Sequence, residues 1–182
     1  MRSGEEIRRF KAKDGREVVL RTPKWEDLED FLELINSLVE EGTDILRSEK
    51  VSREEEIDFL ARVLSNLEKA KLFYLVAEID GKVVAVSETN KRDGYEKHVG
   101  VIGIAIKKCF RDVGIGTEMM KTLIEQAEKM ELKVLTLSAF AINKRAIHVY
   151  EKVGFAKTGV IPKKRFKDGK YVDEIIMTRL LE

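Results

Sequence analysis

A short turn with two glycines is the first segment of this sequence whose residue types could do chemistry. Residues 111–117 read RDVGIGT and lie between an apolar run and a stretch of apolar positions at helical spacing. Glycine lets backbone N–H groups approach an anion closely, and the start of a helix adds a favourable dipole. The turn therefore predicts a phosphate or pyrophosphate site, although a strand-to-helix turn without a ligand would use the same residues. It is not a dinucleotide fingerprint, because the third glycine position is Met119, and no Gly-Lys-Ser/Thr follows as in a P-loop.

A second group of residues comes later, in a short predicted helix that ends at Gly154. Asn143 and Tyr150 are seven residues apart, which is two helical turns, so their side chains point along one face. An amide and a phenol would then line the same groove. The alternative is that Tyr150 is a half-buried core tyrosine without a chemical role.

The N-terminal part of the chain predicts a strand followed by two helices. Residues 17–21 (EVVLR) form the strand, and Thr22 is predicted to cap the first helix, with Pro23 at its first position. Residues 40–51 lose their periodicity and are predicted to be a loop. Ser52 and Glu55 then have capping-box spacing for the second helix. The apolar positions are Leu28, Phe31, Leu32 and Ile35 in the first helix and Ile57, Leu60, Ala61 and Leu64 in the second.

The rest of the chain alternates between strands and helices. Residues 72–79 and 83–89 are β-rich and flank Asp80-Gly81-Lys82, a hairpin signal. Residues 98–106 (HVGVIGIAI) are apolar at both parities, as expected of a central strand covered on both faces. The remaining predictions are a helix from about 115 to 130, a strand at 134–140, a helix at 143–153 and strands at 155–161 and 171–181. This order indicates a mixed α/β sheet in one domain spanning 1–182.

Taken together, the two motifs resemble those of the GNAT superfamily of N-acetyltransferases. The R-x-x-G-x-G turn follows a buried strand, and N-x-x-A-I-x-x-Y-x-x-x-G-F follows the next one. The likeness covers roughly 72–181 and is closest to the bacterial and archaeal branch of phosphinothricin-type and ribosomal-protein-alanine-type enzymes. It implies a mostly antiparallel central sheet with a splayed parallel strand pair, flanked by helices. Gly103 would suit a bulge that splays the pair.

The resemblance also implies acetyl-CoA as co-substrate and a set of residues that bind it. Pantetheine would run along the strand at 104–106, the pyrophosphate would sit on the turn, and Asn143 would reach the pantetheine arm. The cofactor-binding residues implied are Ile104, Ala105, Ile106, Arg111, Asp112, Val113, Gly114, Ile115, Gly116, Thr117 and Asn143.

Direct transfer is the mechanism that the resemblance implies. The acceptor amine would attack the thioester, backbone N–H groups would polarise its oxygen, and Tyr150 would protonate the departing thiolate. The base departs from the family pattern, because residues 100–102 (GVI) contain no acid. Glu88 is the first candidate and Glu174 the second; both could instead be solvated or ion-paired, and His98 is a further possibility. Cys109 is not required as a nucleophile.

Composition excludes several other classes of partner. Thirty-four Lys and Arg balance thirty-three Asp and Glu, for a formal net charge of +1, which argues against nucleic acid as the main partner. Apolar runs are shorter than the ~20 residues of a membrane helix, and no signal peptide is evident. One cysteine favours a cytoplasmic location, and His and Cys show no metal-ligand spacing.

Two functions stay open at this point: an N-acetyltransferase, or a non-catalytic acyl-CoA-binding module that acts as a sensor. Tyr150 favours the enzyme. The acceptor amine could belong to a small molecule or to a protein N-terminus, because the loops expected to form its groove, 38–51 and 162–170, carry no motif. The acidic stretch between Glu40 and Glu56 could attract a cationic acceptor or be a solvated helix face. The oligomeric state is not indicated.

Overall fold

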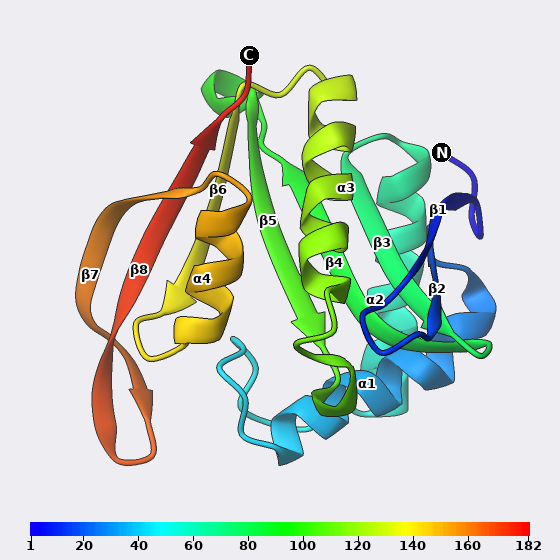
Figure 1. Cartoon of the computed structure of the whole chain (residues 1–182), viewed down its shortest axis with the longest axis horizontal. Coiled ribbons are helices and arrows are strands. Elements are labelled where there is room, and N and C mark those ends of the chain that lie inside the picture. The colour runs from blue at the N-terminus through cyan, green and yellow to red at the C-terminus, as the bar shows by residue number, and fades with distance from the viewer.

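The central feature of the computed structural model, which describes residues 1–182, is an eight-stranded sheet (Figure 1). Its strand order is β1-β2-β3-β4-β5-β6-β8-β7, and every neighbouring pair is antiparallel except β5 and β6. This arrangement confirms the predicted mixed α/β fold with one parallel pair. The strands are β1 (Glu6–Lys11), β2 (Glu17–Arg21), β3 (Leu72–Ile79), β4 (Lys82–Lys91), β5 (Val99–Ile106), β6 (Val134–Phe140), β7 (Ala156–Lys167) and β8 (Lys170–Leu180).

Four helices cover the two faces of the sheet. Helices α1 (Leu28–Glu40) and α2 (Arg53–Glu68) bury their apolar positions on one face, and α3 (Ile115–Lys129) and α4 (Lys144–Lys152) lie on the other, in front of the sheet in Figure 1. The predicted capping box of α2 is present: the Glu55 amide donates to the Ser52 hydroxyl (3.2 Å) and the Ser52 amide to Glu55 Oε2 (2.8 Å). Three 3₁₀ turns, Trp25–Asp27, Gly94–Glu96 and Lys108–Phe110, complete the elements.

Strands β5 and β6 are paired over only three positions before they diverge. Residues Val99 to Val101 face Val134 to Thr136, and beyond them β5 stays paired with β4 while β6 stays paired with β8. The two strands therefore open into a gap, as Figure 1 shows. The prediction of a bulge at Gly103 is wrong, because the register between β4 and β5 runs without a shift from the Ala85–Ile106 pair to the Lys91–Gly100 pair. Divergence of the strands splays the pair.

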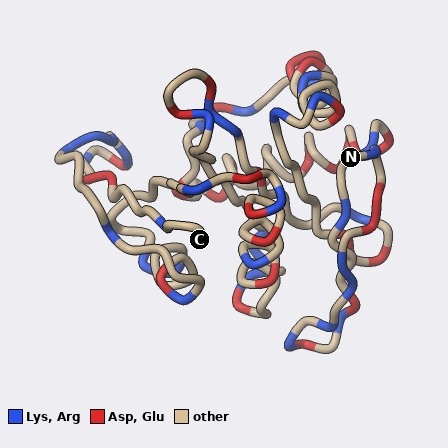
Figure 2. The backbone as a smooth tube through the Cα atoms, turned by 90° about the horizontal axis from the view of Figure 1, so that it is seen from above, with Lys and Arg blue, Asp and Glu red and all other residues tan.

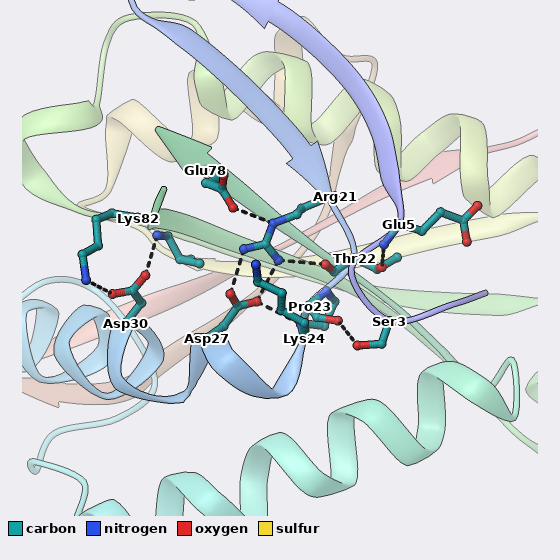
Figure 3. Close-up of polar contacts among 11 residues, drawn as sticks. Ser3, Glu5, Arg21, Thr22, Pro23, Lys24, Asp27, Asp30, Glu78 and Lys82 are labelled. Carbon is teal, nitrogen blue, oxygen red and sulfur yellow. Dashed lines mark hydrogen bonds and ion pairs between the residues drawn. The ribbon is translucent and has the colours of Figure 1, made fainter. Parts of the chain in front are cut away.

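A buried polar network joins β2 to the start of α1 (Figure 3). The Arg21 guanidinium donates to both Asp27 oxygens (2.7 and 2.8 Å) and to Glu78 Oε2 (2.7 Å). The prediction that Thr22 caps α1 is wrong: its hydroxyl donates to the Arg2 carbonyl (2.6 Å) and accepts from the Glu5 amide (2.8 Å). A 3₁₀ turn and then Asp27 precede the helix instead.

Two further elements differ from the sequence prediction. Strand β1 was not predicted, and it pairs with β2 at the sheet edge. Residues 162–170, expected to be a loop, belong largely to a long β7–β8 hairpin. Figure 2 shows Lys and Arg interleaved with Asp and Glu along most of the chain, with the densest run of Lys and Arg on this hairpin, at the far left of the view. No helix of the structure has the length and apolar character needed to cross a membrane.

Candidate active site

A cavity of about 1070 Å³ lies at the gap between β5 and β6. Its walls come from the α1–α2 segment, strands β3 to β6, the turn before α3 and helix α4. Eleven of the predicted site residues line it: Glu88, Ile104, Ala105, Ile106, Arg111, Asp112, Gly114, Gly116, Thr117, Asn143 and Tyr150. Val113, Ile115 and Glu174 do not, so the fold brings most of the predicted set together in one space.

Backbone hydrogen bonds at the start of β5 fix which way its peptide groups point. The His98 carbonyl accepts from the Val134 amide of β6 (3.2 Å), whereas the Val99 carbonyl accepts from Arg92, next to the end of β4 (3.0 Å). Peptide groups alternate sides along a strand. The N–H and C=O groups of even-numbered residues in β5 therefore point towards β6, and those of odd-numbered residues point towards β4.

Beyond Val101 this alternation directs peptide groups into the gap. Ile102 and Ile104 turn their N–H and C=O groups to the open side, and the Ile106 carbonyl there accepts from Arg111 Nε (2.8 Å). The backbone of Ala105 is directed at β4, so its contribution to the cavity is side-chain surface. An extended chain with amide groups of its own can pair with such an open strand edge.

The glycine turn presents a run of backbone amides without partners. None of the amides from Asp112 to Thr117 donates to a group within the chain, and those of the first helical turn have no intrahelical partner by construction. Gly114 has a φ of +96°, which favours glycine. A Cβ on Gly116 would lie 3.0 Å from Ile106 Cδ1, so this glycine lets α3 approach β5 closely.

Side chains around the turn are tied to neighbouring segments. Arg111 forms a bidentate ion pair with Glu41 at the end of α1 (2.6 Å for both bonds), and this lowers the pKa of the Glu41 carboxyl. Asp112 pairs with Arg145 of α4 (3.3 Å). Arg111 thus links the turn to the α1–α2 segment.

Tyr150 and Asn143 occupy different positions relative to α4. Tyr150 is buried on the helix, packs 6.4 Å from Phe155 between ring centroids, and lines the cavity. Burial raises its pKa to about 12, so the phenol is neutral and keeps its proton near pH 7. Asn143 is the N-cap, and its side-chain oxygen accepts from the Ala146 amide (3.1 Å). Its amide NH₂ group remains available to the cavity.

Glu88 lies in a row of residues that crosses three strands. Tyr74 of β3, Glu88 of β4 and Gly103 of β5 are successive register partners, so they share the face covered by α1 and α2. A Cβ on Gly103 would lie 3.3 Å from Glu88 Oε1; the absence of that side chain leaves room for the carboxyl group over β5. Burial raises the pKa of Glu88, opposed by a hydrogen bond from Asn90.

Glu174 has a different environment from Glu88. It is buried on β8, forms an ion pair with Arg165, and lies outside the cavity lining. Its carboxylate already has a cationic partner. His98 and Cys109 are both exposed and outside the lining as well.

Comparison with known proteins identifies the family. The model of the acetyltransferase (GNAT) family matches residues 31–155. This chain belongs to the GNAT acetyltransferase family. Among curated relatives, the L-amino acid N-acetyltransferase AaaT of Escherichia coli (strain K12) is 32% identical over 112 residues, which are 58% of this chain and 67% of that protein.

Solved structures of acetyltransferases share the fold over almost the whole chain. The ribosomal-protein-alanine N-acetyltransferase of Brucella melitensis has a TM-score of 0.79 at 25% identity, covering 89% of this chain and 99% of that one. The phosphinothricin acetyltransferase of Sinorhizobium meliloti, solved in complex with acetyl-CoA, has a TM-score of 0.80 at 20% identity, covering 90% and 88%. Both types named in the sequence prediction are therefore among its structural neighbours.

The residues of this acetyltransferase fit the chemistry of acetyl-CoA. Unpaired amides and a helix N-terminus suit a pyrophosphate, and the open edge of β5 suits the amides of the pantetheine arm. Lys13 from the β1–β2 turn adds a cation that was missed in the sequence: its amide donates to the Val113 carbonyl (2.9 Å), and its side chain lies against Gly114 and forms no ion pair. No group of three or more His, Cys, Asp or Glu is arranged to hold a metal ion.

Tyr74 is a second cavity residue of the acetyltransferase that the sequence did not single out. It is buried, and burial raises its pKa well above 10, with the nearby Glu88 and Glu56 carboxylates adding to the shift. An aromatic residue inside an apolar strand carries no chemical signal in the sequence. The hairpin signal at Asp80-Gly81 predicts only that this strand pairs with the next.

Proposed function

We propose that this GNAT protein is an acetyl-CoA-dependent N-acetyltransferase that transfers the acetyl group directly to an amine on a small molecule or a protein N-terminus. The observation that carries the proposal is the cavity at the β5–β6 gap, which is lined by the turn, the open edge of β5, Tyr150 and Glu88. A non-catalytic acyl-CoA sensor would need the turn and the open edge of β5 to bind its ligand. It would not need a buried neutral phenol and a carboxyl group facing the same space.

Acetyl-CoA supplies a thioester whose carbonyl carbon accepts the amine. The amide of Ile104 is directed into the gap and donates a hydrogen bond to the carbonyl oxygen, where negative charge develops. The amides of Asp112 to Thr117 hold the pyrophosphate, with Lys13 as an added cation, and Asn143 donates to the pantetheine arm. Arg111 keeps the turn in place through Glu41 and the Ile106 carbonyl.

Glu88 removes the proton that the amine must lose. An alkylamine with a pKa of ~10.4 is neutral in only about one molecule per thousand at pH 7.4. Burial makes Glu88 a stronger base than an ordinary carboxylate. The ammonium gives this proton to Glu88, directly or through one water, and the nitrogen lone pair that is freed then forms the C–N bond. A second proton leaves the nitrogen for solvent as the C–S bond breaks. The ion-paired Glu174 is the weaker candidate for this role.

Tyr150 donates a hydrogen bond to the departing sulfur and then its proton. Its pKa of about 12 in the folded protein lies above the ~8.5 of a free thiol, so full proton transfer from the buried phenol to a thiolate with that pKa would be uphill by about 5 kcal/mol. The hydrogen bond from the neutral phenol therefore acts first, on the developing charge. Transfer of the proton completes as the thiol leaves and solvent re-protonates the phenolate.

Two measurements test the proposal. Acetyl-CoA at ~100 times its dissociation constant should stabilise the fold by about 2.7 kcal/mol, and ATP or NADH at equal concentration by much less. Thiol release from acetyl-CoA should depend on an added amine. A protein that binds acetyl-CoA but releases no thiol with any amine would be a sensor, and one whose melting ignores acetyl-CoA would refute both functions.

Three coarser assignments accompany this function. Residues 1–182 act as one acetyltransferase domain, which the continuous eight-stranded sheet supports. The single cysteine supports a cytoplasmic location. The near balance of charges supports neither nucleic acid nor an acidic surface as a partner.

A further inference from the structure

The side of the cavity that faces α1 and α2 is mainly apolar. We call it the acceptor side and define it by the lining residues Ile35, Ile45, Leu46, Phe59, Tyr74 and Val86. Phe59 and Tyr74 meet edge to face, with ring centroids 6.2 Å apart. Walls of this kind gain free energy by covering apolar surface, and aromatic walls favour an aromatic guest.

Carboxyl groups in the cavity are already engaged, with one exception. Four line it: Glu41, Asp44, Glu88 and Asp112. Glu41 pairs with Arg111, Asp44 with Lys167 and Asp112 with Arg145. Glu88 belongs to no ion pair, so one carboxylate is free to face one ammonium group. A polyamine would bury additional positive charges without partners, which is costly.

Arg47 supplies the opposite charge at the acceptor side. It lies on the segment between α1 and α2, lines the cavity and takes part in none of the chain's ion pairs. The buried Glu56 is near enough for Arg47 to oppose the rise in its pKa that burial causes. The other unpaired cations of the lining lie away from the acceptor side: Lys13 comes from the β1–β2 turn and lies against Gly114, and Lys144 and Lys152 come from α4.

We propose that the acceptor is a monoamine with a large apolar or aromatic body and a carboxylate, as in a free amino acid with such a side chain. Glu88 faces the amine, the acceptor side covers the apolar body, and Arg47 binds the carboxylate. This inference rests on the proposed acetyltransferase function and narrows its substrate class. A peptide N-terminus lacks the carboxylate at that position and would give Arg47 no substrate group to bind.

Thiol release with matched amines tests each part of the proposal. Phenylalanine is compared with alanine, which lacks the apolar body, with spermidine, and with two compounds that lack the carboxylate. These are phenethylamine and phenylalanine amide, whose amine pKa values lie on either side of that of phenylalanine, so amine basicity cannot explain a common loss. We expect phenylalanine to exceed all four by at least tenfold in kcat/KM.

Variants then assign the preferences to residues. Arg47→Gln should lower kcat/KM for phenylalanine at least tenfold and leave phenethylamine unchanged, whereas Arg92→Gln, an exposed arginine outside the cavity, should change neither. Phe59→Ala should reduce the ratio of phenylalanine to alanine, a ratio that partial unfolding does not alter.

Contrary results are distinguishable from failure of the function itself. Equal turnover of phenylalanine and phenethylamine, faster turnover of phenylalanine amide or spermidine, or a phenylalanine preference that survives Arg47→Gln would overturn the inference and leave an acetyltransferase. If no amine releases thiol, the function and the inference both fail.

Discussion

Replacing Glu88 by glutamine separates a general base from a structural carboxyl group. Glutamine keeps the shape of the side chain and removes its charge. Glu88 lies opposite Gly103 with its carboxyl over β5, so the amide should occupy the same space. A lost general base typically lowers the rate 10²–10⁴-fold. Because only about one alkylamine in a thousand is neutral at pH 7.4, we expect a loss of about 10²–10³-fold there.

The pH dependence carries the sharper test. Without a base, the variant reacts only with amine molecules that have already lost their proton to solvent. Its rate should therefore rise about tenfold per pH unit until the pH reaches the pKa of the amine, which is between ~8 and ~10.4. The wild-type rate should level off earlier, above the raised pKa of Glu88. The two profiles should therefore converge at high pH. Steady-state thiol release between pH 6 and 10 measures both profiles.

Stability should change in the opposite direction to the rate. The folded-state pKa of Glu88 is raised, so the folded protein prefers the protonated carboxyl, and wild-type stability is lost as pH rises from 4.5 through the raised value. Glu88→Gln removes that loss. The variant should be at least as stable as wild type at pH 7, with no gain below pH 4.5.

Control variants complete this experiment. Glu68→Gln, on the exposed end of α2, tests for a general effect of charge. The reasoning is refuted if Glu88→Gln keeps the wild-type rate and pH profile. If Glu174→Gln instead shows the converging profile, the base is Glu174 despite its ion pair with Arg165.

Three further variants test separate parts of the structure. Tyr150→Phe should lower turnover 10²–10⁴-fold with little change in coenzyme A affinity by calorimetry; normal turnover would show that the proton comes from elsewhere. Gly116→Val should press against Ile106 and weaken coenzyme A binding at least tenfold, about 1.4 kcal/mol, in a protein that circular dichroism shows to be folded. Asp27→Asn leaves the buried Arg21 with Glu78 alone and should cost about 3 kcal/mol in urea unfolding, whereas a cost under 1 kcal/mol would contradict the role given to this network.

Where local pattern and tertiary environment agree, the sequence predicted the elements closely. Residues 72–79 and 134–140 were predicted as strands with the bounds that β3 and β6 have. Strand β1 was not predicted because a register shift between Glu6 and Arg8 breaks the alternation of its buried and exposed side chains. Ile7 and Phe10 therefore both pack against the core, although one position is odd and the other even. A period-2 pattern cannot reveal such a strand.

Proline misled the prediction of the C-terminal hairpin. Pro162 in a lysine-rich stretch indicates a loop, yet β7 continues through it. The register shifts between Ile161 and Arg165, and the Lys163 amide donates to Asp173 Oδ1 (2.8 Å). A bulge therefore accommodates the residue that lacks an N–H, the kind of site at which a strand tolerates proline.

The two halves of the cavity differ in how far the sequence reveals them. The side that would bind acetyl-CoA depends on backbone amides and glycines. The spacing of these glycines along the chain is what indicates the site in the sequence. The acceptor side depends on how α2 is rotated about its axis. The buried positions of α2 are Glu56, Leu60, Val63 and Leu67, and only Leu60 of these belongs to the predicted apolar series. A hydrophobic pattern cannot predict a buried glutamate. The rotation of α2 determines which of its side chains contact Tyr74. The proposal for the acceptor therefore depends on the folded chain, in which neither Glu88 nor Arg47 forms an ion pair although both line the cavity.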